Sequence, residues 1–185
     1  LEIADLNDAD EVSNVNTFSY SMSANGRKVA FVTRATNMGP YSTGSHYCYV
    51  RDLIANTTEL VSVTGTGQPF FTQRCVLSDD GNHVAFSGSS SAGTGTWVRD
   101  LTTGTSQFIS SYAGSVSISG DGRYVVFGGV FGGLSGIQVK DMVTGDVTVA
   151  SVASDGTLLT DGDAVLSGLA PEVISSDGRY ICFTS

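Results

Sequence analysis

Ser119-Gly120-Asp121-Gly122-Arg123-Tyr124-Val125-Val126-Phe127 is the stretch that decides the fold. Three further stretches repeat it, and they begin at Ser23, Ser78 and Ser175. The glycine of the Asn-Gly or Asp-Gly pair recurs after 55, 41 and 56 residues. Such spacing is typical of a repeat architecture in which each repeat is one small supersecondary unit.

Each copy predicts a β-hairpin. Asn-Gly or Asp-Gly between alternating apolar residues favours a two-residue type I′ turn, because both turn positions need a positive φ. With Asp121-Gly122 as the turn, Ile118 faces Val125 and Val116 faces Phe127, so four bulky side chains share one face. The opposite face carries small residues in the four copies: Ala30, Ala85, Val126 and Cys182. We therefore expect successive hairpins to stack, bulky face on small face.

A second pattern follows three of the hairpins and completes the repeat. It begins at Tyr49, Trp97 and Gln138, reads Val-Arg-Asp-Leu or a close variant from the next residue, and leads through a turn to another apolar strand. The turn has Asn56, Gly104 or Gly145, which tolerate a left-handed backbone, and an aspartate four residues earlier can cap its free N–H groups. Each unit then has four antiparallel strands, as a β-propeller blade does. The predicted blades span residues 19–63, 74–111 and 115–152, with a partial blade at 171–185 and one strand of a preceding blade at 1–5.

The two patterns together resemble the TolB-like, WD40-like propeller repeats of bacterial secreted and envelope proteins, and the resemblance covers nearly the whole chain. Two features depart from the pattern: the second blade has shorter loops, and Glu172 stands in the slot of Tyr20, Cys75 and Val116. The resemblance implies an all-β propeller scaffold. Members of that family range from binding platforms to propellers fused to peptidase domains, so the resemblance implies no particular reaction.

Composition narrows the range of functions. The formal net charge is −9, which argues against binding to nucleic acid or anionic membranes, since phosphate groups attract clusters of Lys and Arg. No run of 18 apolar residues predicts insertion into a membrane. The chain begins at Leu1 and shows no signal peptide, so we expect a processed piece of a longer precursor that is secreted or periplasmic.

Blade number and ring closure stay open at this stage. Three full blades and two partial ones do not make an ordinary ring of six to eight. The chain could be an excerpt of a larger propeller, copies could pair their open blade edges, or the first strand could close a four-bladed ring. We favour these three possibilities in that order. The edge strand of an open blade has unpaired backbone groups, so we expect another blade or chain to cover it.

Cys48, Cys75 and Cys182 occupy repeat positions that hold mostly apolar residues in the other blades. No Cys-x-x-Cys spacing indicates zinc. We therefore expect three buried free thiols rather than a disulfide or a reactive cysteine.

Candidate ligands for a metal are carboxylates in two equivalent loops. Asp8 and Asp10, and Asp161 and Asp163, could offer oxygen atoms to Ca²⁺, although turn-forming aspartates give the same pattern. No other cofactor is indicated. Asp161, Asp163 and Glu172 are also the weak candidates for a hydrolase site, since paired carboxylates can act as acid and base. His46 and His83 stand at non-equivalent positions, which predicts no shared catalytic role.

Binding candidates are aromatic residues in loops. Phe70, Phe71 and Phe131 could form an interface if they are exposed. Arg51, Arg99 and Lys140 repeat at one strand position, where we expect a structural role against a neighbouring blade.

These observations favour a non-enzymatic module that binds a protein partner or assembles through open blade edges. The alternatives are a propeller-type hydrolase domain and a carbohydrate- or calcium-binding module. Each would present its site on the loops, where propellers vary most.

Overall fold

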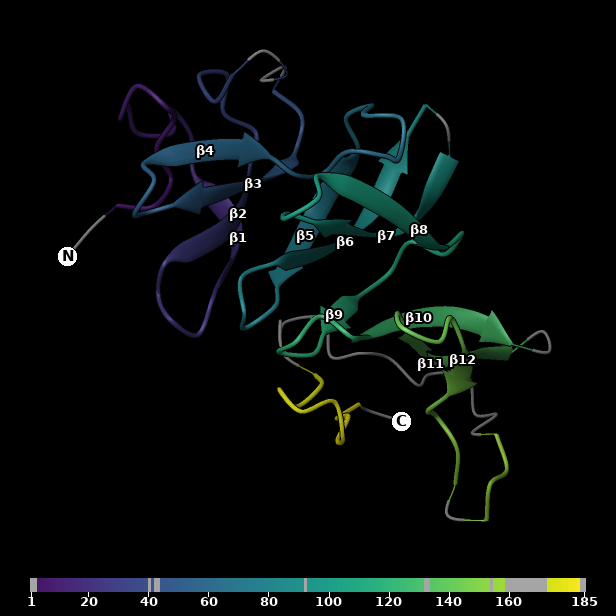
Figure 1. Ribbon diagram of the computed structural model, residues 1–185. Coiled ribbons are helices and arrows are strands. Elements are labelled where there is room, and N and C mark those ends of the chain that lie inside the picture. The colour runs from purple at the N-terminus through teal and green to yellow at the C-terminus, as the bar shows by residue number, and fades with distance from the viewer. Residues whose placement is uncertain are drawn as a thin grey trace.

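The computed structural model describes residues 3–39, 41, 44–91, 93–131, 134–153, 155–158 and 173–183. The described part is all-β, with three four-stranded antiparallel sheets and no helix. In each sheet the strands follow one another in chain order, as in propeller blades. Figure 1 shows the first and third sheets on either side of the second, with β5 in contact with both β1 and β9.

The strands have the following bounds. The first blade contains β1 (Thr17–Met22), β2 (Lys28–Thr33), β3 (Tyr47–Asp52) and β4 (Thr57–Leu60). The second contains β5 (Phe71–Leu77), β6 (His83–Ser90), β7 (Gly93–Asp100) and β8 (Thr105–Ser110). The third contains β9 (Val116–Ile118), β10 (Tyr124–Phe131), β11 (Leu134–Asp141) and β12 (Val147–Val149). A fourth hairpin is marked by the bridge between Ile174 and Ile181.

The register of the hairpins is confirmed, but the predicted turn type is wrong. Ile118 pairs with Val125 and Val116 with Phe127, as expected. However, Gly122 has a φ of 75° while Asp121 has no positive φ, so a type I′ turn is excluded. The Gly122 N–H instead donates to the Ser119 carbonyl, which closes a turn within the five-residue loop from Ser119 to Arg123.

Side chains explain why the longer loop is stable. The Ser119 hydroxyl donates to the Asp121 carboxylate (2.7 Å) and accepts the N–H of Tyr124 (2.9 Å), while Asp121 accepts the N–H of Arg123 (3.0 Å). The same three bonds recur in the other hairpins, around Ser23, Ser78 and Ser175. The side chains of the serine and of the Asn or Asp therefore accept the backbone N–H groups of the longer loop, so the tighter type I′ turn is not required.

The second predicted turn is confirmed. Asn56, Gly104 and Gly145 have φ values of 57°, 68° and 83°. The aspartate four residues before each of them caps two N–H groups of the turn.

Two of these aspartates also pair with the arginine of the hairpin. Arg27 lies 2.9 Å from Asp52, and Arg123 lies 2.7 Å from Asp141. The hydrogen bond from the guanidinium lowers the pKa of each carboxyl group to about 2. The arginine of the first repeat pattern and the aspartate of the second therefore form one ion pair within the blade.

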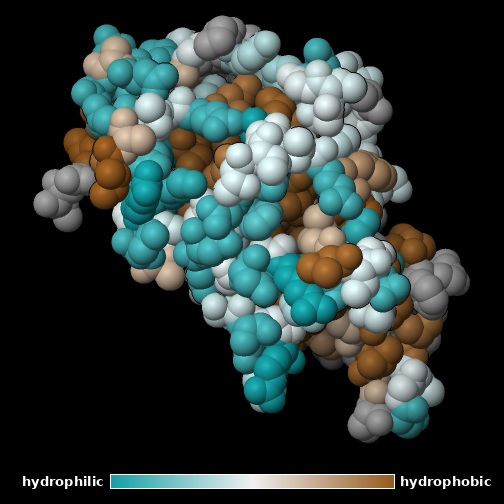
Figure 2. All heavy atoms as spheres, in the orientation of Figure 1, coloured by the Kyte–Doolittle hydropathy of each residue, from teal (hydrophilic) through white to brown (hydrophobic). Residues whose placement is uncertain are grey.

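The core lies between the blades, bulky face against small face, as expected. The small face of the first blade, with Ala30 and Val50, packs on Leu77, Val84 and Phe86 of the second. Equivalent clusters join the second blade to the third and the third to the fourth hairpin. Figure 2 shows apolar atoms reaching the surface between the first and second blades.

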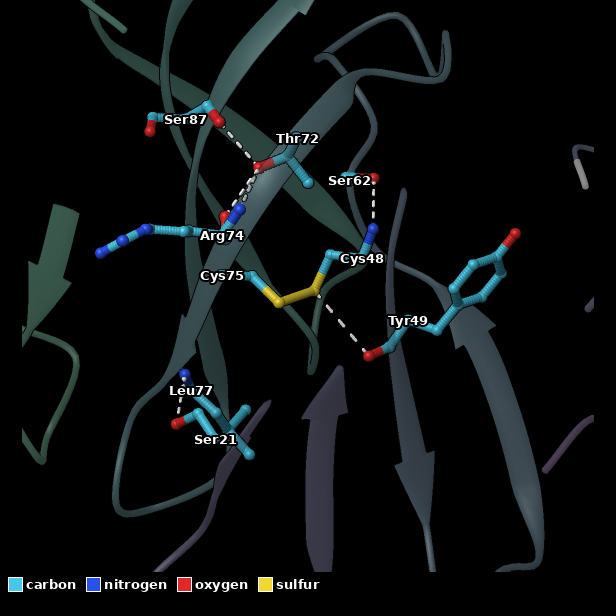
Figure 3. The surroundings of a disulfide bond; sticks show 9 residues. All are labelled: Ser21, Cys48, Tyr49, Ser62, Thr72, Arg74, Cys75, Leu77 and Ser87. Atoms are coloured by element: carbon cyan, nitrogen blue, oxygen red, sulfur yellow. Dashed lines mark hydrogen bonds between the residues drawn. A yellow bond between two sulfur atoms is a disulfide. The ribbon is translucent and has the colours of Figure 1, made fainter. Parts of the chain in front are cut away.

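The prediction of three buried free thiols is wrong. Cys48 on β3 and Cys75 on β5 form a disulfide across the first inter-blade core, with Cα atoms 6.3 Å apart (Figure 3). Cys182 is a free thiol, and it is exposed. Both paired positions are buried as the repeat alignment suggested, but they belong to faces that meet, which brings the two sulfur atoms together.

No membrane-crossing helix occurs in the part of the chain that the structure describes.

Candidate interaction surface

Successive blades are interlocked at the turns between their first two strands. The residue that opens the second strand covers the turn glycine of the next blade: a Cβ built on Gly122 would lie 2.2 Å from His83 Nδ1, and one on Gly178 would lie 2.3 Å from the Tyr124 ring. In the first pair Lys28 takes this place, and its Nζ donates to the Gly81 carbonyl at 2.8 Å. Gly122 and Gly178 must be glycines because the neighbouring side chain fills the space of a Cβ.

Backbone hydrogen bonds join the same turns. The N–H of Ala24 donates to the Asp79 carbonyl, and the N–H of Gly120 donates to the Ser176 carbonyl, both at 2.9 Å. The N–H of Asp80 donates to Gly120 in the same way. The four turns therefore form a continuous row along one end of the molecule, and each inter-blade contact repeats the one before it.

The inner strand of the first blade is not covered in this way. Tyr20 and Met22 on β1 are 75% and 58% exposed. Cys75 and Val116 take the place of Tyr20 in the second and third blades, and they are 1% and 5% exposed because the small face of the preceding blade covers them. We call Tyr20 and Met22 the first-blade face. It is apolar, and it belongs to a class of surface that this fold otherwise buries.

The outer strands of the same blade are covered by the N-terminal segment. Phe31 and Tyr49 are buried with Val15 packed against them. Arg51, which is fully buried, donates to the Asn7 carbonyl (3.1 Å) and to the Asp10 carboxylate (2.8 Å). Only the innermost strand of this face is therefore left open.

The complementary feature lies on the fourth hairpin. Tyr180 is the equivalent of Lys28, His83 and Tyr124, and it is 64% exposed. At the first blade, Gly26 is the one turn glycine of the four hairpins with nothing within 4 Å of a built Cβ, among the residues described. The chain thus presents both halves of its own inter-blade contact, one at each end of the row.

The predicted metal ligands of the first loop have other partners. Asp10 accepts Arg51, and Asp8 accepts the N–H of Thr58 at 2.6 Å. Within the described ranges, no three His, Cys, Asp or Glu side chains are grouped so that they could hold a metal ion. Asp161 and Asp163 lie outside the described residues, so the calcium site stays a prediction.

The predicted catalytic carboxylates cannot be placed together. Asp161, Asp163 and Glu172 all lie outside the described residues. The histidines are apart: His83 covers Gly122, while His46 lies between the rings of Phe18 (4.8 Å between centroids) and Phe71 (5.5 Å).

The three predicted binding aromatics differ in position. Phe70 is buried and packs edge-on against Phe86 and Trp97, so it belongs to the core. Phe71 is partly exposed at the start of β5. The side chain of Phe131 lies outside the described part of the structure.

The arginine of the second repeat pattern joins neighbouring segments, as expected. Arg99 on β7 lies 2.6 Å from Glu59 on β4 of the preceding blade. Sequence reasoning missed the first-blade face, although a signal was available: the alignment sets Tyr20 and Met22 against positions that the second and third blades bury.

No family model and no curated protein matches this chain. Solved structures do. TolB from Acinetobacter baumannii has a TM-score of 0.59 at 19% identity, over 92% of this chain and 38% of that one. A putative TolB from Agrobacterium tumefaciens has a TM-score of 0.56 at 18% identity, over 93% of this chain and 60% of that one.

A third match is the β-propeller domain of the Trilobed protease from Pyrococcus furiosus, described as having an open velcro topology. Its TM-score is 0.52 at 21% identity, over 71% of this chain and 40% of that one. The described chain therefore has the β-propeller fold of TolB-like proteins, and it spans 38%, 60% and 40% of the three solved chains.

Proposed function

We propose that this chain is a non-enzymatic propeller module that binds protein through its first-blade face, and that its partner is the small face of another propeller blade. The observation that carries the proposal is the exposure of Tyr20 and Met22, at 75% and 58%, in positions where the second and third blades bury their residues. In solution, a second copy of this chain supplies such a partner.

The shape of the partner follows from the repeat. Inside this chain, a small face with Ala30 or Ala85 packs on the bulky face of the next blade. A lysine, histidine or tyrosine from the small-face side then covers the turn glycine. Tyr180 and Gly26 are the free halves of this contact, so the fourth hairpin of one copy fits the first blade of the next.

We further propose that the module works in an oxidising compartment, outside the cytoplasm. The Cys48–Cys75 disulfide supports this, since such bonds persist in secreted and periplasmic proteins and are rare in reducing compartments.

The experiment is light scattering of the purified chain over a range of concentrations, with the Tyr20→Asp variant beside it. We expect the parent chain to associate and the variant to associate at least about thirtyfold more weakly, because a buried tyrosine at the centre of an interface contributes about 2 kcal/mol or more. Ile54→Asp is the matched control, since Ile54 is exposed to 76% and lies in a turn away from the inter-blade contacts of the described residues.

A parent chain that stays monomeric near 19.2 kDa at all concentrations would contradict the proposal. Equal weakening by Tyr20→Asp and Ile54→Asp would also contradict it, because the effect would then come from added charge alone.

A further inference from the structure

A second feature of the chain lies away from the first-blade face. A cavity of about 450 Å³ opens between the second and third blades, at the end opposite the turn row. Its wall includes Phe71 and Arg74 from β5, Ser89 from β6, Thr94 from β7 and Ser115 just before β9. This volume is within the usual range for a small-molecule site.

The lining carries one charge, and that charge is positive. None of the residues that line the cavity is acidic. Arg27, Arg51, Arg99 and Arg123 each pair with a carboxylate. Arg74 forms no ion pair with any carboxylate of the described residues. Arg34 and Arg179 likewise form no ion pair among the described residues, but Arg74 differs from them in that it lines a cavity, where its charge attracts anions.

A β-bulge sets the position of Arg74. The pairing of β5 with β6 shifts between Thr72 and Arg74. The Thr72 hydroxyl lies 2.7 Å from the Ser87 carbonyl and also contacts the backbone of Arg74, which fixes the bulge. Figure 3 shows the Arg74 side chain extending away from the Cys48–Cys75 disulfide. Bulges of this kind re-aim one side chain relative to the strand, and they often do so at functional sites.

The rest of the lining indicates what the anion is attached to. Ser87, Ser89, Thr94 and Ser115 line the cavity with hydroxyl-bearing side chains. The Ser87 hydroxyl donates to the Gly114 carbonyl, so toward a ligand it acts as an acceptor. The ring of Phe71 supplies one apolar wall. A guanidinium fork matches the two oxygen atoms of a carboxylate, hydroxyl groups match a polyhydroxylated ligand, and an aromatic ring can pack on the apolar C–H face of a sugar.

We propose that this cavity binds a sugar acid, with the carboxylate on Arg74, the hydroxyl groups on the serine and threonine side chains, and the ring against Phe71. This assignment does not depend on the first-blade face, and it adds a small-molecule site to the protein-binding surface.

The test is titration of the ¹⁵N-labelled chain with D-glucuronate, followed by amide chemical shifts, in a buffer free of carboxylates. We expect saturable shifts at Gly88, Ser89 and Gly114, and no such shifts with glucose, which lacks the carboxylate. Arg74→Gln is expected to weaken glucuronate binding by at least about tenfold, since hydrogen bonds to charged groups are the stronger ones. Arg74→Lys, which keeps the charge but loses the fork, should give an intermediate affinity.

Arg34→Gln is the matched control. It removes one positive charge from an exposed arginine that contacts the Phe18 ring and does not line the cavity. Its affinity for glucuronate should equal that of the parent, and the amide spectrum of each variant shows that it is folded.

Three results would overturn the assignment. The first is the absence of saturable shifts with glucuronate. The second is an equal loss of affinity in Arg74→Gln and Arg34→Gln. The third is binding of N-acetylphenylalanine in place of glucuronate, which would identify a C-terminal peptide carboxylate as the ligand.

Discussion

Gly122 carries two constraints, one from its backbone and one from the next blade. Its φ is 75°, and a Cβ would lie 2.2 Å from His83 Nδ1. We expect Gly122→Ala to lower the free energy of unfolding by about 2 to 4 kcal/mol, because the left-handed conformation alone costs a non-glycine residue about 1 to 2 kcal/mol and the clash adds to it. Urea unfolding with a constant m-value measures this difference.

Gly26→Ala separates the two constraints. Gly26 has a φ of 70° and nothing within 4 Å of a built Cβ, so only the backbone cost applies. The smaller loss expected for Gly26→Ala, and partial recovery of Gly122→Ala when His83 is also changed to alanine, would assign the remainder to the inter-blade contact. An equal loss of unfolding free energy at the two glycines would show that the inter-blade contact does not contribute to stability.

The hairpin turn shows what a residue pattern can and cannot predict. The alternation of apolar residues fixed the register, since a shift by one residue would turn Val116 and Ile118 to the wrong face. The turn type was not predictable from Asp121-Gly122 alone, because Ser119 competes with the backbone for the same N–H groups. The serine was part of every quoted repeat, but its role depends on a hydrogen bond that spacing does not reveal.

At the scale of elements, the disulfide joins β3 to β5 across a sequence separation of 27 residues. Closing a loop of this length restricts the unfolded chain, and the chain-entropy estimate is about 3.5 kcal/mol. We expect the double variant Cys48→Ala, Cys75→Ala to lose about 2 to 4 kcal/mol of stability in denaturant unfolding. Cys182→Ser is the control and should unfold as the parent does, since Cys182 is exposed and unpaired.

Thiol counting gives an independent check on the same bond. The native chain should react at one cysteine before reduction and at three after it. A double variant as stable as the parent, or three reactive thiols in the untreated protein, would contradict the inter-blade bond.

The cysteine error has a definite physical origin. Aligning the repeats compares positions that are equivalent by rotation, and it placed both cysteines correctly in buried slots. The positions that touch, however, are those on opposite faces of successive blades. At the next interface the equivalent positions are Thr96 and Val116, and neither of these side chains can form a covalent bond that would reveal the contact. A fold model that stacks the blades, rather than an alignment that superposes them, is needed to see the bond.

At the scale of the whole molecule, the fold was predictable and the site was not. Four copies of one hairpin and three of a second turn are enough to indicate blades, because each repeat agrees with the others in register and in its turn residues. The first-blade face and the Arg74 cavity arise from how one blade meets the next. Arg74 occupies the repeat position held by Ser19 and Ser115 in the neighbouring blades, so its importance appears only when the cavity around it is known.

The direction of the proposed association gives the last prediction. Contact between the fourth hairpin of one copy and the first blade of another is heterologous, since different surfaces meet, and it leads to closed rings or open chains of molecules. Tyr20→Asp removes the first-blade half of the contact, and Tyr180→Asp removes the other half. Each variant alone is therefore expected to be monomeric in light scattering.

Mixing the two variants restores one complete contact. The first-blade face of Tyr180→Asp is intact, and so is the fourth hairpin of Tyr20→Asp, so an equimolar mixture should form a dimer and nothing larger. If the first-blade faces of two copies instead packed on each other, Tyr180→Asp alone would dimerise and the mixture would hold no additional dimer. The mass of the mixture therefore decides whether the row of inter-blade contacts continues from one molecule to the next.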